Sequence, residues 1–229
     1  MTPRTALVEL RRYDLHPGQR EVLISLFDAE LVETQEAVGI SVLGQFRDLD
    51  RPDQFVWMRG FEDAESRGRA LQAFYGGPAW AQHRDAANAT MTAFDDVLLL
   101  RPAPDGALAL PDGGPPSGGL VAATVYQPDD LDAFTALMAE AGEEALTELG
   151  ARRTAAYVSA DVVNTFPVLP VRDDAAVYVR IARFASAQEH AAHRRRLEAA
   201  AASDELLATL RASVRDELRL VPTDRSLLR

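Results

Sequence analysis

Histidine is the side chain in this sequence best suited to proton transfer near neutral pH. His83 follows Trp80 by three residues, so the two share one face of the short helix expected after Pro78. In that position His83 is a candidate general base or axial haem ligand. The alternative is a packing residue that hydrogen-bonds a neighbouring backbone group.

A second pair of histidines, His190 and His193, also lies three residues apart on an expected helix. Two histidines at this spacing could bind a metal. The run Arg194-Arg195-Arg196 follows directly, and local positive charge opposes a cation. The pattern therefore favours a solvated helix face, and we expect no metal site.

Two missing residue types narrow the chemistry further. The chain has no cysteine and no lysine, so all of its 24 basic residues are arginines. Cysteine-based nucleophiles, Cys-ligated metals, Schiff bases and the P-loop lysine are thereby excluded. No glycine-rich phosphate loop or metal-ligand motif is present, so we expect no cofactor. What remains is proton transfer and electrostatic stabilisation by His, Arg, Tyr and acids.

The charge balance restricts the partners. There are 35 acidic residues against 24 basic ones, a net charge of −11. Nucleic acids and anionic membranes both require clustered positive charge, so neither is an expected partner. No apolar run approaches transmembrane length, and Met1 to Ala6 lacks an apolar signal core. We expect a cytoplasmic protein.

The chain is divided by a stretch rich in proline and glycine. Pro102 to Gly119 contains five of each, which is typical of a linker. The sequence predicts a first domain over 1–103, a linker over 104–118 and a second domain over 119–229.

The hydrophobic patterns predict the same order of elements in both halves. In the first half we expect strands over 6–13, 38–46, 55–61 and 97–101, with helices after Pro17, over 63–75 and after Pro78. In the second half we expect strands over 121–126, 152–159, 175–184 and 217–221, with helices over 131–141 and 186–201, the latter extended by 204–213. The order β-α-β-β-α-β is that of a ferredoxin-like unit. The expected fold class is α+β, with two tandem ferredoxin-like units that form a dimeric-α/β-barrel-like pseudo-dimer.

Strand alternation then places charges in the expected barrel interior. If Val56 and Met58 face the helices, the opposite face carries inward-pointing residues: Glu9, Arg11, Tyr13, Phe55, Trp57 and Arg59, with Tyr178 and Arg180 at the equivalent positions of the second half. Buried charges must be paired or must await a ligand. The alternative to a ligand site is a Glu9–Arg59 or Glu9–Arg11 ion pair that joins the sheets.

Two tracts carry a family resemblance. The first runs from Phe55-Val56-Trp57-Met58-Arg59-Gly60-Phe61 through Phe74-Tyr75-Gly76-Gly77-Pro78-Ala79-Trp80 to His83-Arg84-Asp85-Ala86-Ala87-Asn88. The second is Asn164-Thr165-Phe166-Pro167 with Leu169-Pro170-Val171-Arg172. Both resemble signatures of the NIPSNAP family. The resemblance implies the dimeric α/β-barrel superfold, with the halves as an internal dimer. Related barrels include cofactor-free oxygenases, haem-handling enzymes, cyclases and plain binding proteins, so the resemblance selects no activity.

These observations predict a site for a small anionic or phenolic molecule. His83 and Arg59 are the candidate catalytic residues, and the candidate ligand-binding residues are Glu9, Tyr13, Trp57, Trp80, Tyr178 and Arg180. One interpretation is a cofactor-free isomerase, cyclase or oxygenase; the alternative is a non-catalytic interaction or scaffolding barrel. A homodimer is a further expectation, with the apolar loop Phe166 to Val171 as its candidate contact.

Overall fold

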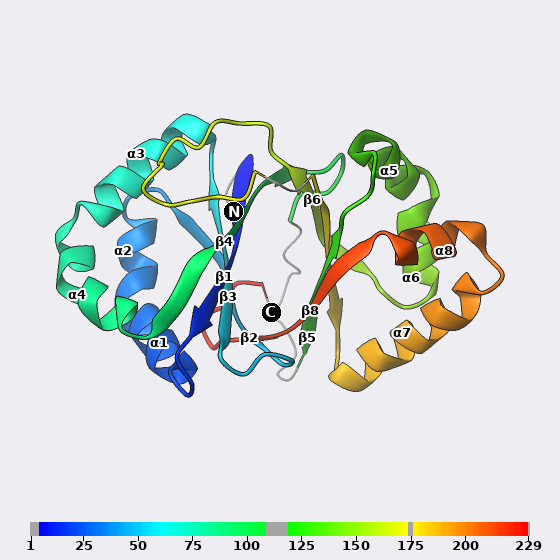
Figure 1. The fold of residues 1–229 in the computed structure, drawn as a ribbon, viewed down its shortest axis with the longest axis horizontal. Helices are drawn as coiled ribbons and strands as arrows, with labels where there is room; N and C mark the ends of the chain where they lie inside the picture. The colour runs from blue at the N-terminus through cyan, green and yellow to red at the C-terminus, as the bar shows by residue number, and fades with distance from the viewer. Residues whose placement is uncertain (1–4, 109–118, 174–175, 229) are drawn as a thin grey trace. The chain divides into compact units, whose positions relative to one another are not determined.

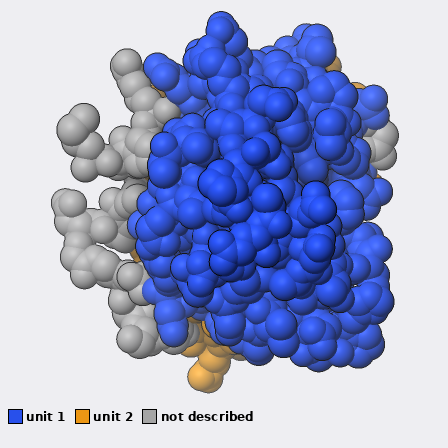
Figure 2. Space-filling model, turned by 90° about the vertical axis from the view of Figure 1, so that its left-hand side faces the viewer, with its two compact units in different colours: residues 1–101, 160–173, 222–228 blue, residues 102–159, 174–221, 229 orange. Residues whose placement is uncertain are grey.

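The computed structural model describes residues 5–108, 119–173 and 176–228. The chain forms two compact units, shown in different colours in Figure 2. Unit 1 comprises residues 1–101, 160–173 and 222–228, and unit 2 comprises 102–159, 174–221 and residue 229. The units are interleaved along the chain, because two later segments belong to unit 1. The division into domains over 1–103 and 119–229 stays a prediction. Residues 109–118 of the predicted linker lie outside the described residues.

Unit 1 contains a four-stranded antiparallel sheet in the order β4-β1-β3-β2. Its strands are β1 (Leu7–Leu15), β2 (Ser41–Asp48), β3 (Gln54–Phe61) and β4 (Met91–Pro102). Helices cover one face of this sheet (Figure 1): α1 (Arg20–Leu26), the π-helical segment η1 (Phe27–Leu31), α2 (Val32–Glu36), α3 (Ala64–Tyr75) and α4 (Pro78–Asn88).

Unit 2 has its own four-stranded antiparallel sheet, in the order β6-β7-β5-β8. Its strands are β5 (Leu120–Tyr126), β6 (Arg153–Ser159), β7 (Tyr178–Phe184) and β8 (Val214–Pro222). Its helices are α5 (Leu131–Leu137), the π-helical segment η2 (Met138–Gly142), α6 (Glu143–Glu148), α7 (Ala187–Ala201) and α8 (Glu205–Ala212). The expected extension of α7 is a separate helix, because Asp204 caps α8 by accepting a hydrogen bond from the Leu207 amide at 3.0 Å.

Local sequence signals explain where the helices begin and end. Asp63 and Ser66 form a reciprocal capping box at the start of α3. Ser186 caps α7 by accepting a hydrogen bond from the Glu189 amide. Gly39 and Gly150 follow the helices before β2 and β6, with φ angles of 91° and 93°. This left-handed backbone favours glycine, so the same turn returns the chain to the sheet in both units.

The helix-facing side of the unit 1 sheet is the side that carries Trp57 and Arg59. The Phe27 ring of η1 lies 4.9 Å from the Trp57 ring, centroid to centroid, and Arg67 of α3 contacts Glu9. The expectation that these residues face the barrel interior is therefore wrong. Alternation fixes which residues share a face, but Val56 and Met58 on the other face are equally buried, so the apolar pattern could not distinguish the two faces.

The loop formed by residues 160–173 is anchored to unit 1 by two buried side chains, while most of its other residues are exposed. Phe166 and Leu169 are buried there, whereas Val168 is 79% exposed. Two of the six apolar residues expected at a homodimer contact are thus used within the unit, whereas Pro167, Val168 and Pro170 stay exposed. The homodimer remains a prediction. No helix within residues 5–108, 119–173 and 176–228 has the length and apolar character needed to cross a membrane.

Candidate functional sites

A buried charge cluster lies between the sheet and helices of unit 1. The carboxylate of Glu9 accepts hydrogen bonds from three guanidinium groups: Arg11 Nη1 at 2.6 Å, Arg59 Nε at 2.7 Å and Arg67 Nε at 2.6 Å. All four side chains are fully buried. The register of β1 and β3 produces this arrangement, because Glu9 pairs with Arg59 across the ladder. We call these four residues the arginine cluster.

Neighbouring polar groups satisfy part of the arginine cluster. Arg11 Nε donates to the Tyr13 hydroxyl at 2.9 Å. Arg59 Nη1 lies 3.4 Å from both Gln35 Oε1 and the Tyr75 hydroxyl. Arg67 Nη1 donates to Asn164 Oδ1 at 2.9 Å, which ties the loop 160–173 to α3.

The arginine cluster still has more donors than acceptors. The Nη2 atoms of Arg11, Arg59 and Arg67, together with Trp57 Nε1, are buried and have no hydrogen-bond partner among the described residues. Three cations surround one carboxylate, and burial opposes ionisation of Glu9. The three arginines outweigh that effect and hold the pKa of Glu9 far below its usual range. The Trp57 ring offsets some of the excess charge, since the Arg59 and Arg11 guanidinium carbons lie 5.0 and 5.6 Å from its centroid.

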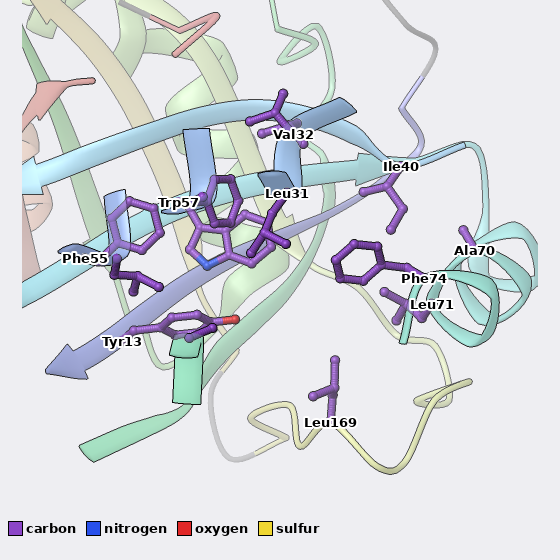
Figure 3. Close-up of a cluster of buried hydrophobic side chains, with 14 of the residues drawn as sticks. Tyr13, Leu31, Val32, Ile40, Phe55, Trp57, Ala70, Leu71, Phe74 and Leu169 are labelled. Atoms are coloured by element: carbon purple, nitrogen blue, oxygen red, sulfur yellow. The ribbon is translucent and has the colours of Figure 1, made fainter. Parts of the chain in front are cut away.

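The structure separates the predicted unit 1 residues into two groups. Tyr13 and Trp57 lie beside each other (Figure 3), with ring centroids 5.9 Å apart. Both rings contact Arg11 of the arginine cluster, whose guanidinium carbon lies 5.4 and 5.6 Å from their centroids. Trp80 packs on Tyr75 at 5.1 Å. His83 lies on α4, where its Nε2 is 3.5 Å from Glu30 Oε2, a carboxylate that is about half exposed. His83 is therefore paired at the rim of the unit and is not a member of the arginine cluster.

In unit 2 the predicted residues Tyr178 and Arg180 meet at one carboxylate on α6. The Tyr178 hydroxyl lies 3.2 Å from Glu143 Oε1, and Arg180 Nε donates to Glu143 Oε2 at 2.9 Å. Arg180 also donates to the Ala151 carbonyl. Burial raises the pKa of Tyr178 above its usual range, and the neighbouring Glu143 charge adds to the shift. Both phenol and guanidinium are held in fixed positions.

A cavity of about 240 Å³ opens beside Arg180, between the sheet of unit 2 and helices α7 and α8. Strand register explains the space. Ala122 pairs with Ala182 in unit 2, two residues from the Thr124–Arg180 pair. In unit 1, Leu7 pairs with Phe61 two residues from Glu9–Arg59. Two alanines thus occupy positions that a leucine and a phenylalanine fill in unit 1.

Two histidines of α7 line this cavity. His190 is 1% exposed and His193 is 6% exposed. His190 Nε2 lies 2.8 Å from Glu217 Oε1 of β8. His193 Nδ1 lies 3.0 Å from the Leu149 carbonyl oxygen. A carbonyl can only accept, so Nδ1 carries the proton, and the lone pair of neutral His193 is on Nε2.

Electrostatics sets the charge state of this second site. Burial lowers the pKa of His193, so its neutral form predominates at pH 7. Burial opposes ionisation of Glu217 too, but the His190 hydrogen bond and the nearby cationic groups hold the pKa of Glu217 below its usual range. The cavity therefore combines a neutral imidazole, an ionised carboxylate and the Arg194 guanidinium, whose Nε is 3.4 Å from Glu217 Oε2.

The prediction that His190 and His193 lie on a solvated helix face is wrong. The run Arg194 to Arg196 is exposed, but the two histidines point to the sheet. The position of the helix cap could have indicated this. Arg67 is the fourth residue after the Asp63 cap of α3, and His190 is the fourth after the Ser186 cap of α7. Sequence reasoning also missed Arg67 and Glu217 as members of the two sites.

Comparison with known proteins identifies the domain type of unit 1. Residues 8–105 match the family model of NIPSNAP. The chain therefore carries a NIPSNAP domain over these residues, and the resemblance inferred from sequence is confirmed there. No curated protein matches the chain in sequence.

Several solved structures resemble the chain. A protein from Fusobacterium nucleatum, provisionally assigned as a monooxygenase, is 11% identical, with 97% of this chain and 94% of that chain covered and a TM-score of 0.60. A protein described as anthrone oxidase-like is 16% identical, with 96% and 92% covered and a TM-score of 0.60. A NIPSNAP family protein of unknown function from Agrobacterium tumefaciens is 17% identical, with 46% and 96% covered and a TM-score of 0.43. The first two show that the chain shares a mixed α and β fold with those proteins.

Proposed function

We propose that the chain binds a small phenolic or enolic molecule in the cavity of unit 2 and removes its acidic proton through His193. The observation that supports this most directly is the state of His193. Its Nδ1 is fixed by the Leu149 carbonyl, which leaves the lone pair of the neutral ring on Nε2, and its side chain lines the cavity. Such an imidazole is prepared to accept a proton.

The surroundings suit an acid that becomes an anion. Phe184, Leu146 and the alanines supply apolar lining, and Tyr126 adds an aromatic face. Arg180 and Arg194 supply positive charge for a developing phenolate or enolate. The cavity is smaller than the roughly 300–1,000 Å³ common for drug-sized ligands, which favours a compact molecule.

The proposed step is a proton transfer from the ligand O–H to His193 Nε2, giving an oxyanion and an imidazolium. Isomerisation, cyclisation and reaction with oxygen can all begin from such an anion. Glu217 of β8 and His190 of α7 form a second acid–base pair that lines the cavity, which could take up or return a proton in a later step.

For unit 1 the geometry favours a non-catalytic role. The arginine cluster has no exposed side-chain surface, and it joins the sheet to α3 and to the loop 160–173. The catalytic pair predicted from sequence, Arg59 and His83, is not part of this proposal. We also infer that the two units are copies of one ferredoxin-like unit. The shared element order, the corresponding strand pairings and the matching Gly39 and Gly150 turns support this.

Filling the cavity tests the proposed function. Leucine at position 122 would place in unit 2 the side chain that Leu7 supplies in unit 1, and overpacking against a ligand costs about 1–3 kcal/mol. Ala122→Leu is therefore expected to weaken ligand binding by about 5- to 160-fold. The measurement is calorimetric titration with a panel of phenols, naphthols and anthrone, followed by oxygen-electrode assays on those that bind.

Ala199→Leu is the matched control, because Ala199 is an exposed residue of α7 that does not line the cavity. It should bind every ligand as the parent does. Equal affinities in the parent and in Ala122→Leu would place the binding site elsewhere.

A further inference from the structure

The arginine cluster of unit 1 contains more buried positive charge and more donors than its own acceptors can satisfy. Three guanidinium groups converge on Glu9, and four buried N–H-bearing nitrogens have no partner among the described residues. Leaving a buried donor unsatisfied costs about 1–3 kcal/mol, and more for a charged group. An isolated packing role does not account for four such atoms in one cluster.

We propose that the arginine cluster binds a small planar monovalent oxoanion, of the size of formate or nitrate. This site is distinct from the cavity of unit 2 and does not depend on the function proposed there. Its donors are the Nη2 atoms of Arg11, Arg59 and Arg67 and the indole Nε1 of Trp57.

The chemistry of the donors determines the class of anion. A guanidinium presents a planar array of N–H donors that matches planar oxoanions. Glu9 already occupies one side of each arginine through Nε or Nη1, so a second carboxylate-like group would use the remaining Nη2 atoms. The net charge of the four side chains is +2, from three arginines and one glutamate, and one monovalent anion would reduce it to +1.

Burial determines the size. The side chains of Glu9, Arg11, Arg59 and Arg67 have no solvent-exposed surface. The aromatic groups around them are packed, with Tyr75 stacked on Phe166 at 5.7 Å and 19°. An anion much larger than formate would have to displace this cover. Tyr75 is half-buried and its hydroxyl lies 3.4 Å from Arg59 Nη1, so an anion would enter the arginine cluster by transient movement of Tyr75.

Thermal unfolding of the full chain at pH 7 and constant ionic strength tests this proposal, with sodium formate replacing sodium gluconate. At a formate concentration 100 times its Kd, the melting temperature should be raised by about 5–11 °C, and it should go on rising with the logarithm of the formate concentration. Equilibrium dialysis with radiolabelled formate should give one formate bound per chain. Identical melting temperatures in the two salts, or no bound formate, would overturn the proposal.

Trp57→Phe and Tyr13→Phe locate the effect. Trp57→Phe removes one unpartnered donor and keeps an aromatic ring. The formate concentration for half-saturation in the dialysis should therefore rise about 12- to 160-fold, the worth of one hydrogen bond to a charged group. Tyr13→Phe removes only an acceptor of Arg11 Nε and should not weaken formate binding. Weakening by both variants alike, or by neither, would contradict the assigned site. The parent comparison of formate with gluconate stands even if Trp57→Phe fails to fold.

Discussion

Glu9→Gln is expected to destabilise the protein by about 3–5 kcal/mol, the usual cost of removing one partner from a buried ion pair. The substitution keeps the shape of the side chain but removes the carboxylate that three buried guanidinium groups share. For a chain of this size the melting temperature should fall by roughly 6–20 °C. Denaturant unfolding of the parent and the variant at pH 7 measures the difference.

A surface ion pair on α3, the helix that carries Arg67, provides the control. Glu65 and Arg69 form an ion pair on α3 in which both side chains are well exposed. Exposed pairs contribute about 0–1 kcal/mol, so Glu65→Gln should leave stability nearly unchanged. A loss below about 1 kcal/mol for Glu9→Gln as well would show that the arginines do not depend on that carboxylate. If the proposed anion binds, formate should recover part of the Glu9→Gln loss.

His193→Asn is expected to lower turnover by about 10²- to 10⁴-fold, the usual contribution of a general base. The asparagine amide can still donate to the Leu149 carbonyl, as His193 Nδ1 does, but it offers no basic Nε2. Ligand affinity should change much less than kcat. Steady-state kinetics on any substrate found in the panel separates the two effects, and an unchanged kcat would exclude His193 as the base.

The same variant should change the pH dependence of stability. Burial lowers the pKa of folded His193 below its unfolded value, so the unfolded chain binds the extra proton more readily. The stabilising contribution of neutral His193 is therefore complete above about pH 6.5 and is lost as the pH falls through the lower folded pKa. Unfolding free energies between pH 5 and 7 should fall less in His193→Asn than in the parent. The same decrease of unfolding free energy with pH in both proteins would contradict the lowered pKa of His193.

The order of elements could be predicted from sequence because its signals are local. Caps such as Asp63, the break before Pro78 and the alternating strands each depend on a few neighbouring residues. The strand faces could not be assigned in this way. Strand alternation correctly predicts that Glu9, Trp57 and Arg59 share one face of the sheet. It does not predict which face the helices cover, because that depends on tertiary packing when both faces are apolar.

The histidines of α7 illustrate a different limit. The helix is rich in alanine and arginine, so it has no wide apolar stripe to show which side is buried. The strand pairing that sets Ala122 beside Ala182 indicates which side of α7 is buried. Two small alanines on the facing sheet leave room for polar side chains of the helix. Recognising such a site requires the pairing of strands that lie about 60 residues apart, as the positions of these two alanines show.

The interleaving of the units has a consequence for synthesis on the ribosome. Arg67 donates a hydrogen bond to Asn164, which lies 97 residues downstream. The backbone N–H of Gln45 donates to the Ser226 hydroxyl, which lies 181 residues downstream. Chains lengthen by about 5–20 residues each second and domains tend to fold as they emerge. Unit 1 begins first but cannot complete these bonds until residues 160–173 and 222–228 have appeared, after most of unit 2. The nascent NIPSNAP domain must therefore wait, with its charged interior incompletely enclosed, for about 6–25 seconds.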